Sequence, residues 1–231
     1  MADANRSVTN ILTLDIEDWC QSSPEVFSAA GASLASAAPT ARTITNTRSL
    51  LKILDEYKTR ATCFILGSVA EAYPDLIREI HDSGHEIASH GYEHLPVYFR
   101  TPEEFRADVV RSLECLERIT GKKIRGYRAP YFSITRTTRW ALPILADLGL
   151  EYDASLFPLH HRYYRFPGWE GAQDAERFPC NLTFGDRRIL ELPVTTARIM
   201  GQNLPISGGV FLGFLPLALF ARSIRNANRR G

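Results

Sequence analysis

The sequence lacks the closely spaced cysteine pairs that mark zinc ribbons and thioredoxin-like redox sites. Its four cysteines stand at positions 20, 63, 115 and 180, and no two of them form a C-x-x-C pair. Cys63 and Cys115 fall in apolar patterns, so we expect both to be small core residues. Cys20 follows an acidic cluster, where a role as a metal ligand is the less favoured alternative.

An excess of one charge and a long hydrophobic run are also missing. The 27 basic and 26 acidic side chains give a formal charge of +1, which argues against a nucleic-acid-binding surface. No basic segment followed by an apolar stretch opens the chain, so no secretory signal is visible. The late stretch VFLGFLPLALFA is about half a membrane span and contains a proline. We expect cytoplasmic residence, no membrane span and no nucleic-acid partner.

What the sequence does contain is an alternation of strand-like and helix-like segments. Strands are expected at residues 10–16, 61–67, 85–90, 123–130, 150–156 and 188–194. Helices are expected at residues 47–60, 68–84, 101–121 and 135–149. Such repeats predict parallel strands with helices outside, in a β/α barrel or an open sheet. We expect a single domain over residues 1–231, with a long excursion at 157–188 that is functional or irregular.

Polar residues stand at the ends of several expected strands. Asp15 ends the first strand, His90 ends the third, Arg128 follows the fourth and Asp153 ends the fifth. In a parallel barrel the carboxyl ends of the strands form one face, where active sites lie. We therefore expect these side chains to converge.

The segments TLDIED and SHGYEH predict a metal site. His90 and His94 have the spacing i, i+4, which lets two imidazoles bind one cation. Asp15, Glu17 and Asp18 crowd three acids into four positions, and a cation would offset their repulsion. Two histidines and one carboxylate leave open positions on a divalent metal, and a second carboxylate can then act as a base.

Four segments, TLDIED, GHEIASHGYEH, RGYRAPYFSIT and DASLFP, resemble in order and spacing the motifs of polysaccharide deacetylases with the NodB-homology fold (carbohydrate esterase family 4). The resemblance covers residues 10–155. The stretches DIEDWCQ, SLFPLHHRYY and SGGVFLGFLP are similar to the branch associated with exosortase (PEP-CTERM) exopolysaccharide loci. The resemblance implies an α/β fold, a distorted and incomplete (β/α) barrel, and association with an envelope polysaccharide system.

The resemblance implies a hydrolase that removes N-acetyl groups from a polysaccharide with the help of a divalent metal. Asp15 matches the base, and His90 and His94 match two metal ligands. The third ligand is an acid after the base, where we favour Asp18 and keep Glu17 open, although strand alternation puts Glu17 on the face of Asp15. Zinc suits such ligands best, while cobalt, nickel or iron would also fit.

Three further residues match supporting roles in this family, and a fourth is a substitute for a missing one. Arg128 matches the arginine that orients the base, and Asp153 matches a buried acid that pairs with this arginine. Tyr131 stands where a backbone N–H helps to hold the oxyanion. His161 is the internal candidate for protonating the leaving amine, with a polar surface loop as an equal alternative.

The chain departs from the family pattern near its end. The strand LELPVTT has no histidine where the family has leucine-x-histidine, and no His-Pro-Trp segment precedes the final NRRG. Either the chain is shorter than its relatives or another group donates the proton. A missing last strand would leave an open barrel edge. The segment VFLGFLPLALF would cover this edge, or the protein would self-associate through it.

Two other functions remain open from the sequence. A carbohydrate-binding protein of the same fold could have lost catalysis with its general acid, and glycan binding without acetate release would identify it. A metal amidohydrolase acting on a small amide would be identified by a narrow, closed pocket.

Overall fold

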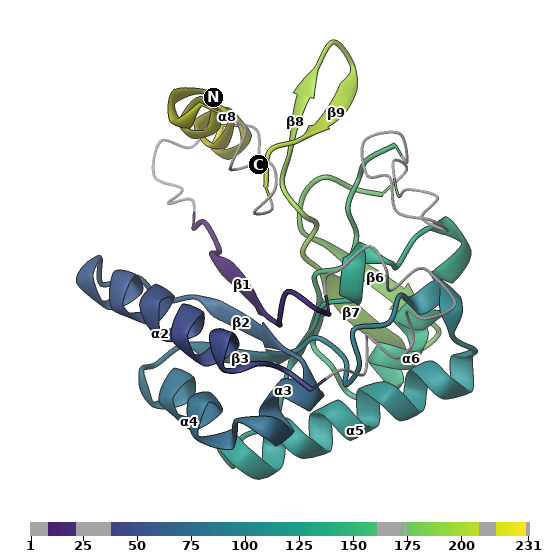
Figure 1. Ribbon diagram of the computed structural model, residues 1–231. Coiled ribbons are helices and arrows are strands. Elements are labelled where there is room, and N and C mark those ends of the chain that lie inside the picture. Colours follow the sequence, from purple (N-terminus) through teal and green to yellow (C-terminus); the bar gives the residue numbers. More distant parts are fainter. Residues whose placement is uncertain (1–8, 22–37, 161–171, 173–174, 208–215, 230–231) are drawn as a thin grey trace.

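The computed structural model describes residues 9–21, 38–160, 172, 175–207 and 216–229. Its centre is a seven-stranded sheet in the order β1-β2-β3-β4-β5-β7-β6 (Figure 1). The strands are β1 (Thr13–Ile16), β2 (Thr62–Ile65), β3 (Glu86–Ser89), β4 (Gly126–Tyr127), β5 (Tyr152–Asp153), β6 (Cys180–Phe184) and β7 (Arg187–Glu191). All neighbours pair in parallel except β6 and β7. The predicted α/β fold with a parallel sheet is confirmed.

The sheet is open in the part of the chain that the structure describes, since β1 and β6 form its two edges. An incomplete barrel was expected, and the order of the strands agrees with it. Among the described residues β1 pairs with β2 alone, and an edge strand of this kind can support strand addition. Self-association through this edge stays a prediction.

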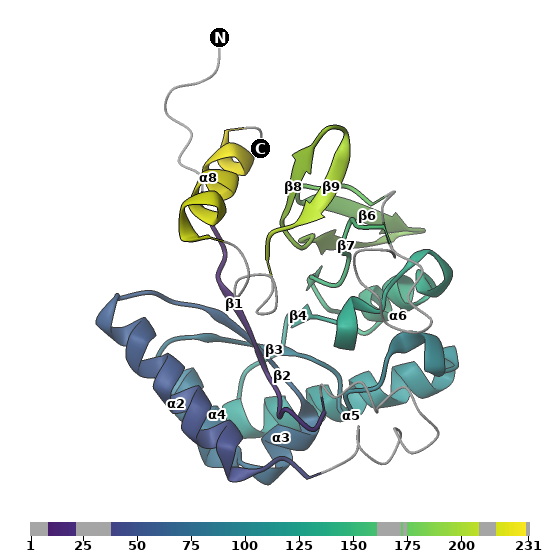
Figure 2. The ribbon, with the colours of Figure 1, turned by 45° about the horizontal axis from the view of Figure 1, so that its top comes forward.

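Helices cover one side of the sheet. They are α2 (Ala41–Glu56), α3 (Gly67–Ala72), α4 (Pro74–Asp82), α5 (Pro102–Thr120) and α6 (Ala141–Asp147). Figures 1 and 2 show α2, α3, α4 and α5 together on one side of β1–β3, while the hairpin of β8 (Thr196–Ile199) and β9 (Gln202–Pro205) lies on the other side with α8 (Leu217–Asn228). The strand ends that carry the polar residues are therefore surrounded by loops and not by the helical layer.

Helix α5 forms where local signals predict it. Thr101 and Glu104 make a capping box, with Pro102 at the first helical position and Gly121 ending the helix at φ 65°. The segment 68–84, expected as one helix, is instead two helices. The break is at Tyr73, whose extended φ of −132° fits the restriction that a following proline imposes on its neighbour.

The core lies between the sheet and the helices. Every residue of β2 is buried, as are the inward faces of α3, α4 and α5. Cys63 and Cys115 are 0% and 3% exposed and lie in one apolar cluster, which confirms their expected core positions. Burial of this face anchors the strands whose carboxyl ends carry the candidate site.

The C-terminal third differs more from expectation. Part of the predicted excursion at 157–188 is strand β6, and the β8–β9 hairpin was not predicted. Of the apolar stretch VFLGFLPLALFA, only Pro216 onward is described, and α8 has no buried residue there. None of the described helices has both the length and the apolarity that a bilayer crossing requires.

Candidate functional site

Three side chains from two strand ends meet in one place. Glu17 directly follows β1, while His90 follows β3 and His94 lies in the next loop. The Nε2 atom of His94 lies 2.7 Å from Oε2 of Glu17, and that of His90 lies 3.5 Å from the same oxygen. The three ligand atoms lie within 4.8 Å of one another. Both histidines are almost fully buried, so the group forms a shielded cluster.

Backbone carbonyls orient both imidazoles. Nδ1 of His90 donates to the carbonyl of Arg128 at 2.8 Å, and Nδ1 of His94 donates to the carbonyl of Gln21 at 2.7 Å. A carbonyl can only accept, so each Nδ1 carries a proton and each Nε2 is directed toward Glu17. Carbonyls in this position are the usual supports of metal-binding histidines. The donor set and its supports therefore fit a divalent cation.

The electrostatics of the cluster also fit a cation. Burial alone would raise the pKa of Glu17, but the charge of His94 and hydrogen bonds from both histidines hold that pKa well below its ordinary value. Burial alone would lower the pKa of His94, yet the attraction of Glu17 raises that pKa overall. The carboxylate is therefore ionised, and the site already favours positive charge beside it.

Asp18, the favoured third ligand from the sequence, lies elsewhere. Its Oδ2 accepts hydrogen bonds from the backbone N–H of Thr40 at 2.5 Å and from the hydroxyls of Thr40 and Thr43 at 2.7 and 2.9 Å. Thr40 is the N-cap of α2, so the Asp18 carboxylate sits at the positive end of that helix. The structure brings the alternative, Glu17, to the histidines because Glu17 shares the strand face of Asp15.

Asp15 and Arg128 form an ion pair beside this cluster. The Arg128 guanidinium is 2.7 Å from Oδ1 of Asp15, and it also donates to the Thr13 hydroxyl at 2.9 Å and to the Ala154 carbonyl at 3.2 Å. Its central carbon lies 4.1 Å from the centre of the Phe64 ring. The Asp15 side chain keeps 27% exposure. Arg128 thus holds an accessible carboxylate in one orientation, as the sequence anticipated.

The expected pairing of Arg128 with Asp153 needs correction. The Nε atom of Arg128 donates to the carbonyl of Ala154 rather than to the Asp153 carboxylate. Asp153 instead accepts from the hydroxyl and the N–H of Ser155 at 2.6 and 3.1 Å. The Ser155 hydroxyl in turn accepts from the Ala129 N–H at 2.7 Å. Asp153 therefore supports the arginine indirectly, through the backbone on either side of it.

Glu191, which the sequence reasoning missed, faces Asp153. It ends β7 directly opposite Asp153 in the parallel register, and both residues are 0% exposed. Its Oε1 accepts from the N–H of Leu156 at 3.2 Å. Burial, and next the charge of Asp153, raise the pKa of Glu191 well above its ordinary value. The only signal in the sequence is a single acid within the apolar run RILELPV.

Tyr131 packs directly on the group of Glu17, His90 and His94. Its ring centre lies 4.4 Å from that of His94, and its hydroxyl donates to the Gln21 carbonyl at 2.7 Å. Tyr131 and Phe132 both have positive φ angles, 55° and 49°, in a short 3₁₀ turn. Such a conformation costs non-glycine residues roughly 1–2 kcal/mol. This turn holds the Tyr131 ring against His94 at a conformational cost.

His161, the predicted proton donor, lies outside the described residues. Its neighbour His160 is described, is exposed, and lines a cavity in the C-terminal third.

Comparisons with known proteins find similarity to carbohydrate deacetylases. The family model for polysaccharide deacetylases matches residues 39–152, and a domain family of unknown function (DUF3473) matches residues 154–231. A peptidoglycan deacetylase of Helicobacter pylori is 33% identical over 107 residues, 46% of this chain and 36% of that protein. A chitooligosaccharide deacetylase of Azorhizobium caulinodans is 35% identical over 86 residues, 37% of this chain and 41% of that protein. The chain thus spans well under half of the curated relatives it matches.

Solved structures share the fold. A Mycobacterium smegmatis protein described as a polysaccharide deacetylase superposes with a TM-score of 0.57 at 28% identity, over 80% of this chain and 58% of that chain. The allantoinase PuuE superposes with a TM-score of 0.57 at 18% identity, over 93% of this chain and 72% of that chain. The second likeness concerns the fold alone.

Proposed function

Because residues 39–152 match the family model for polysaccharide deacetylases, and four segments resemble the motifs of the NodB-homology fold (carbohydrate esterase family 4), we propose that this chain is a metal-dependent hydrolase that removes N-acetyl groups from a polysaccharide. The observation that carries the proposal is the meeting of Glu17, His90 and His94. Arg128 links this group to the base, because its carbonyl accepts from His90 and its guanidinium holds Asp15.

Glu17, His90 and His94 are the proposed metal ligands. A divalent cation held there would supply polarisation of the amide carbonyl and a lowered pKa for water. Two imidazoles and a carboxylate suit zinc best, with cobalt, nickel and iron as alternatives. The Nδ1 hydrogen bonds of both histidines support this assignment, since they keep each Nε2 directed toward the Glu17 carboxylate.

The remaining residues would move or hold protons and charge. Asp15 takes the proton of the attacking water, and the Arg128 guanidinium keeps the Asp15 carboxylate oriented. The Tyr131 backbone N–H donates to the oxyanion that develops on the carbonyl oxygen. Asp153 supports this arrangement through Ser155. We keep His161 as the proposed donor of a proton to the leaving amine.

The proposal also specifies the class of substrate. Relatives named for peptidoglycan and for chitooligosaccharides all act on N-acetylated sugars, which supports this substrate class. The motifs DIEDWCQ and SLFPLHHRYY support an exopolysaccharide of an exosortase-linked envelope system. We also retain a single domain over residues 1–231, since β2–β4 and β6–β7 share one sheet although different family models match them.

A catalytically impaired carbohydrate-binding protein is the less favoured function. The base, its arginine and the ligand group are all present in the described residues, although the strand LELPVTT lacks the histidine that the family carries there. The test is acetate release from N-acetylated oligosaccharides with zinc present. Asp15→Asn and His90→Ala should abolish release. His81→Ala should not, because His81 is a partly exposed histidine outside the site, although it has the same four-residue spacing from His85 as His90 has from His94. Full activity in the first two variants would refute the proposed roles.

A further inference from the structure

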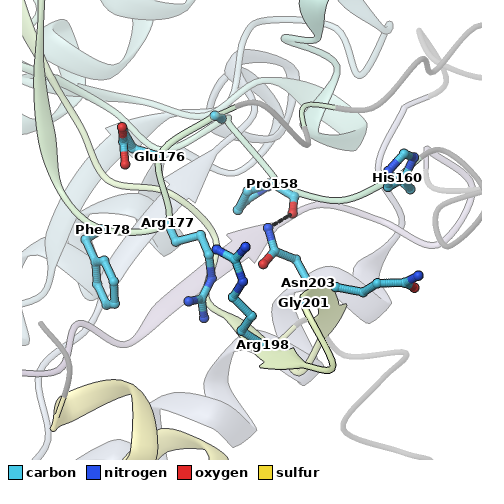
Figure 3. A pocket seen from close by; sticks show the side chains of 10 residues that line it. Pro158, His160, Glu176, Arg177, Phe178, Arg198, Gly201 and Asn203 are labelled. Carbon is cyan, nitrogen blue, oxygen red and sulfur yellow. Dashed lines mark hydrogen bonds between the residues drawn. The ribbon is translucent and has the colours of Figure 1, made fainter.

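A cavity of about 420 Å³ opens in the C-terminal third, outside the group of Glu17, His90 and His94 (Figure 3). Its walls come from the chain after β5, including Pro158, from the segment before β6, including Arg177 and Phe178, and from the β8–β9 hairpin, including Arg198 and Asn203. This volume lies within the usual range of small-ligand sites, about 300–1,000 Å³. The cavity falls in the region matched by the domain family of unknown function.

Two arginines form the charged wall of the cavity. The Arg177 guanidinium donates to the hydroxyl and the carbonyl of Thr196 at 3.2 and 2.7 Å. Arg198 stands two positions after Thr196 on the same strand, so its side chain leaves β8 on the same face. Figure 3 shows both guanidinium groups near the middle of the cavity, with the Glu176 carboxylate directed away from them. Such a wall favours a negatively charged group.

Asn203 adds a hydrogen-bond acceptor beside the arginines. Its Nδ2 donates to the Pro158 carbonyl at 2.9 Å, which fixes the orientation of the amide. Its Oδ1 is buried without a hydrogen-bond partner among the described residues. A buried acceptor of this kind calls for a donor such as a hydroxyl group. The half-buried Phe178 ring supplies an apolar surface on the same cavity.

The cavity lies close to the proposed catalytic residues along the chain. Ala154, whose carbonyl accepts from Arg128, is four residues before Pro158. Four residues reach at most about 14 Å when fully extended. A neighbouring unit of the same polymer could therefore occupy the cavity while another unit lies at Asp15.

We propose that this cavity is a subsite for a sugar unit bearing a carboxylate, that is, a uronic acid of the polysaccharide. Planar guanidinium groups match the two oxygens of a carboxylate, and Asn203 Oδ1 would accept from a ring hydroxyl. The inference rests on the proposed function for the presence of a polysaccharide, and it deepens that function by naming an acidic substrate.

Binding by the full-length, zinc-loaded protein tests the subsite without relying on turnover. The probes are an oligosaccharide that alternates N-acetylglucosamine with glucuronic acid, and an N-acetylglucosamine oligosaccharide of equal length. Calorimetry should show at least about tenfold tighter binding of the acidic probe, equivalent to about 1.4 kcal/mol. Arg198→Gln should weaken binding of the acidic probe until it is close to that of the neutral probe.

Arg106→Gln is the matched control, because it removes the same charge from an exposed arginine that pairs with Asp147. It should keep the preference for the acidic probe. Equal binding of both probes by the unaltered protein, or a preference that survives Arg198→Gln, would overturn the subsite. Tighter binding of a sulfated oligosaccharide would overturn the assignment to a carboxylate. Arg198-dependent binding without any acetate release would keep the subsite and refute the proposed function instead.

Discussion

The carboxyl groups of Asp153 and Glu191 lie opposite each other on β5 and β7, and both are fully buried. Two adjacent carboxylates cannot both stay ionised in such a place. Asp153 accepts two hydrogen bonds from Ser155, which favours its ionised form, so Glu191 holds the proton. The pair therefore carries one negative charge behind Arg128. Burial raises the pKa of Asp153 overall, while hydrogen bonds from Glu191 and Ser155, and last the charge of Arg128, oppose the rise.

Stability should depend on pH through Glu191. The pKa of this group in the folded protein lies well above the ordinary value of about 4.3, so the folded state binds more protons than the unfolded state between these two pKa values. The contribution of Glu191 to stability is then fully present below about pH 4.3 and is lost as pH rises toward the folded pKa. Glu191→Gln, which mimics the protonated group, should remove this dependence.

Urea unfolding at pH 5 and pH 8 measures the effect. The free energy of unfolding of the unaltered protein should fall more between these two pH values than that of Glu191→Gln. Glu191→Ala should instead lose about 1–3 kcal/mol, because the Leu156 N–H and Asp153 lose a buried partner. Parallel pH dependence in the unaltered protein and Glu191→Gln would contradict the shared proton.

Replacement of Glu17 and of Asp18 should have different effects. Glu17→Gln should abolish stoichiometric zinc binding, because it removes the carboxylate that both histidines face. Asp18→Asn should keep zinc but lower the free energy of unfolding by about 1.5–3 kcal/mol, the value of hydrogen bonds to a charged group. Zinc content by elemental analysis and denaturant unfolding separate the two outcomes. Loss of zinc in Asp18→Asn alone would restore Asp18 as the ligand.

Arg128→Lys should reduce catalysis while keeping the charge. The lysine cannot donate at once to Asp15, Thr13 and the Ala154 carbonyl, so the base loses its fixed orientation. Misplacement of a reacting group by about 1 Å can cost about 10²-fold in rate. We expect a fall in kcat of this order with little change in KM. Arg125→Lys, at an exposed arginine nearby in sequence, is the control and should have normal kinetics.

Much of this architecture is predictable from sequence because its signals are local. The capping box at Thr101 and the glycine at 121 define α5 within a few residues of its ends. Apolar runs of strand length mark the parallel strands, and polar residues at their ends mark the site. The position of Glu17 also follows locally, from strand alternation with Asp15.

The features that were missed depend on contacts between distant parts of the chain. Asp18 lies beside α2 because Thr40, 22 residues later, supplies two of its hydrogen bonds. Glu191 meets Asp153 only through the register of β5 with β7. No spacing in the sequence reports either contact. For the same reason, the sequence did not show that Arg128 donates to a backbone carbonyl instead of to the expected acid, Asp153.

The most direct test of the central claim is a zinc titration of metal-free protein, with bound zinc and acetate release from an N-acetylated oligosaccharide measured together. Our account predicts that both rise in proportion and saturate at one zinc per chain, and that Glu17→Gln shows neither. Acetate release that is already complete in metal-free protein, or zinc binding at full stoichiometry in Glu17→Gln, would contradict the assignment of Glu17, His90 and His94 as the metal site of a deacetylase.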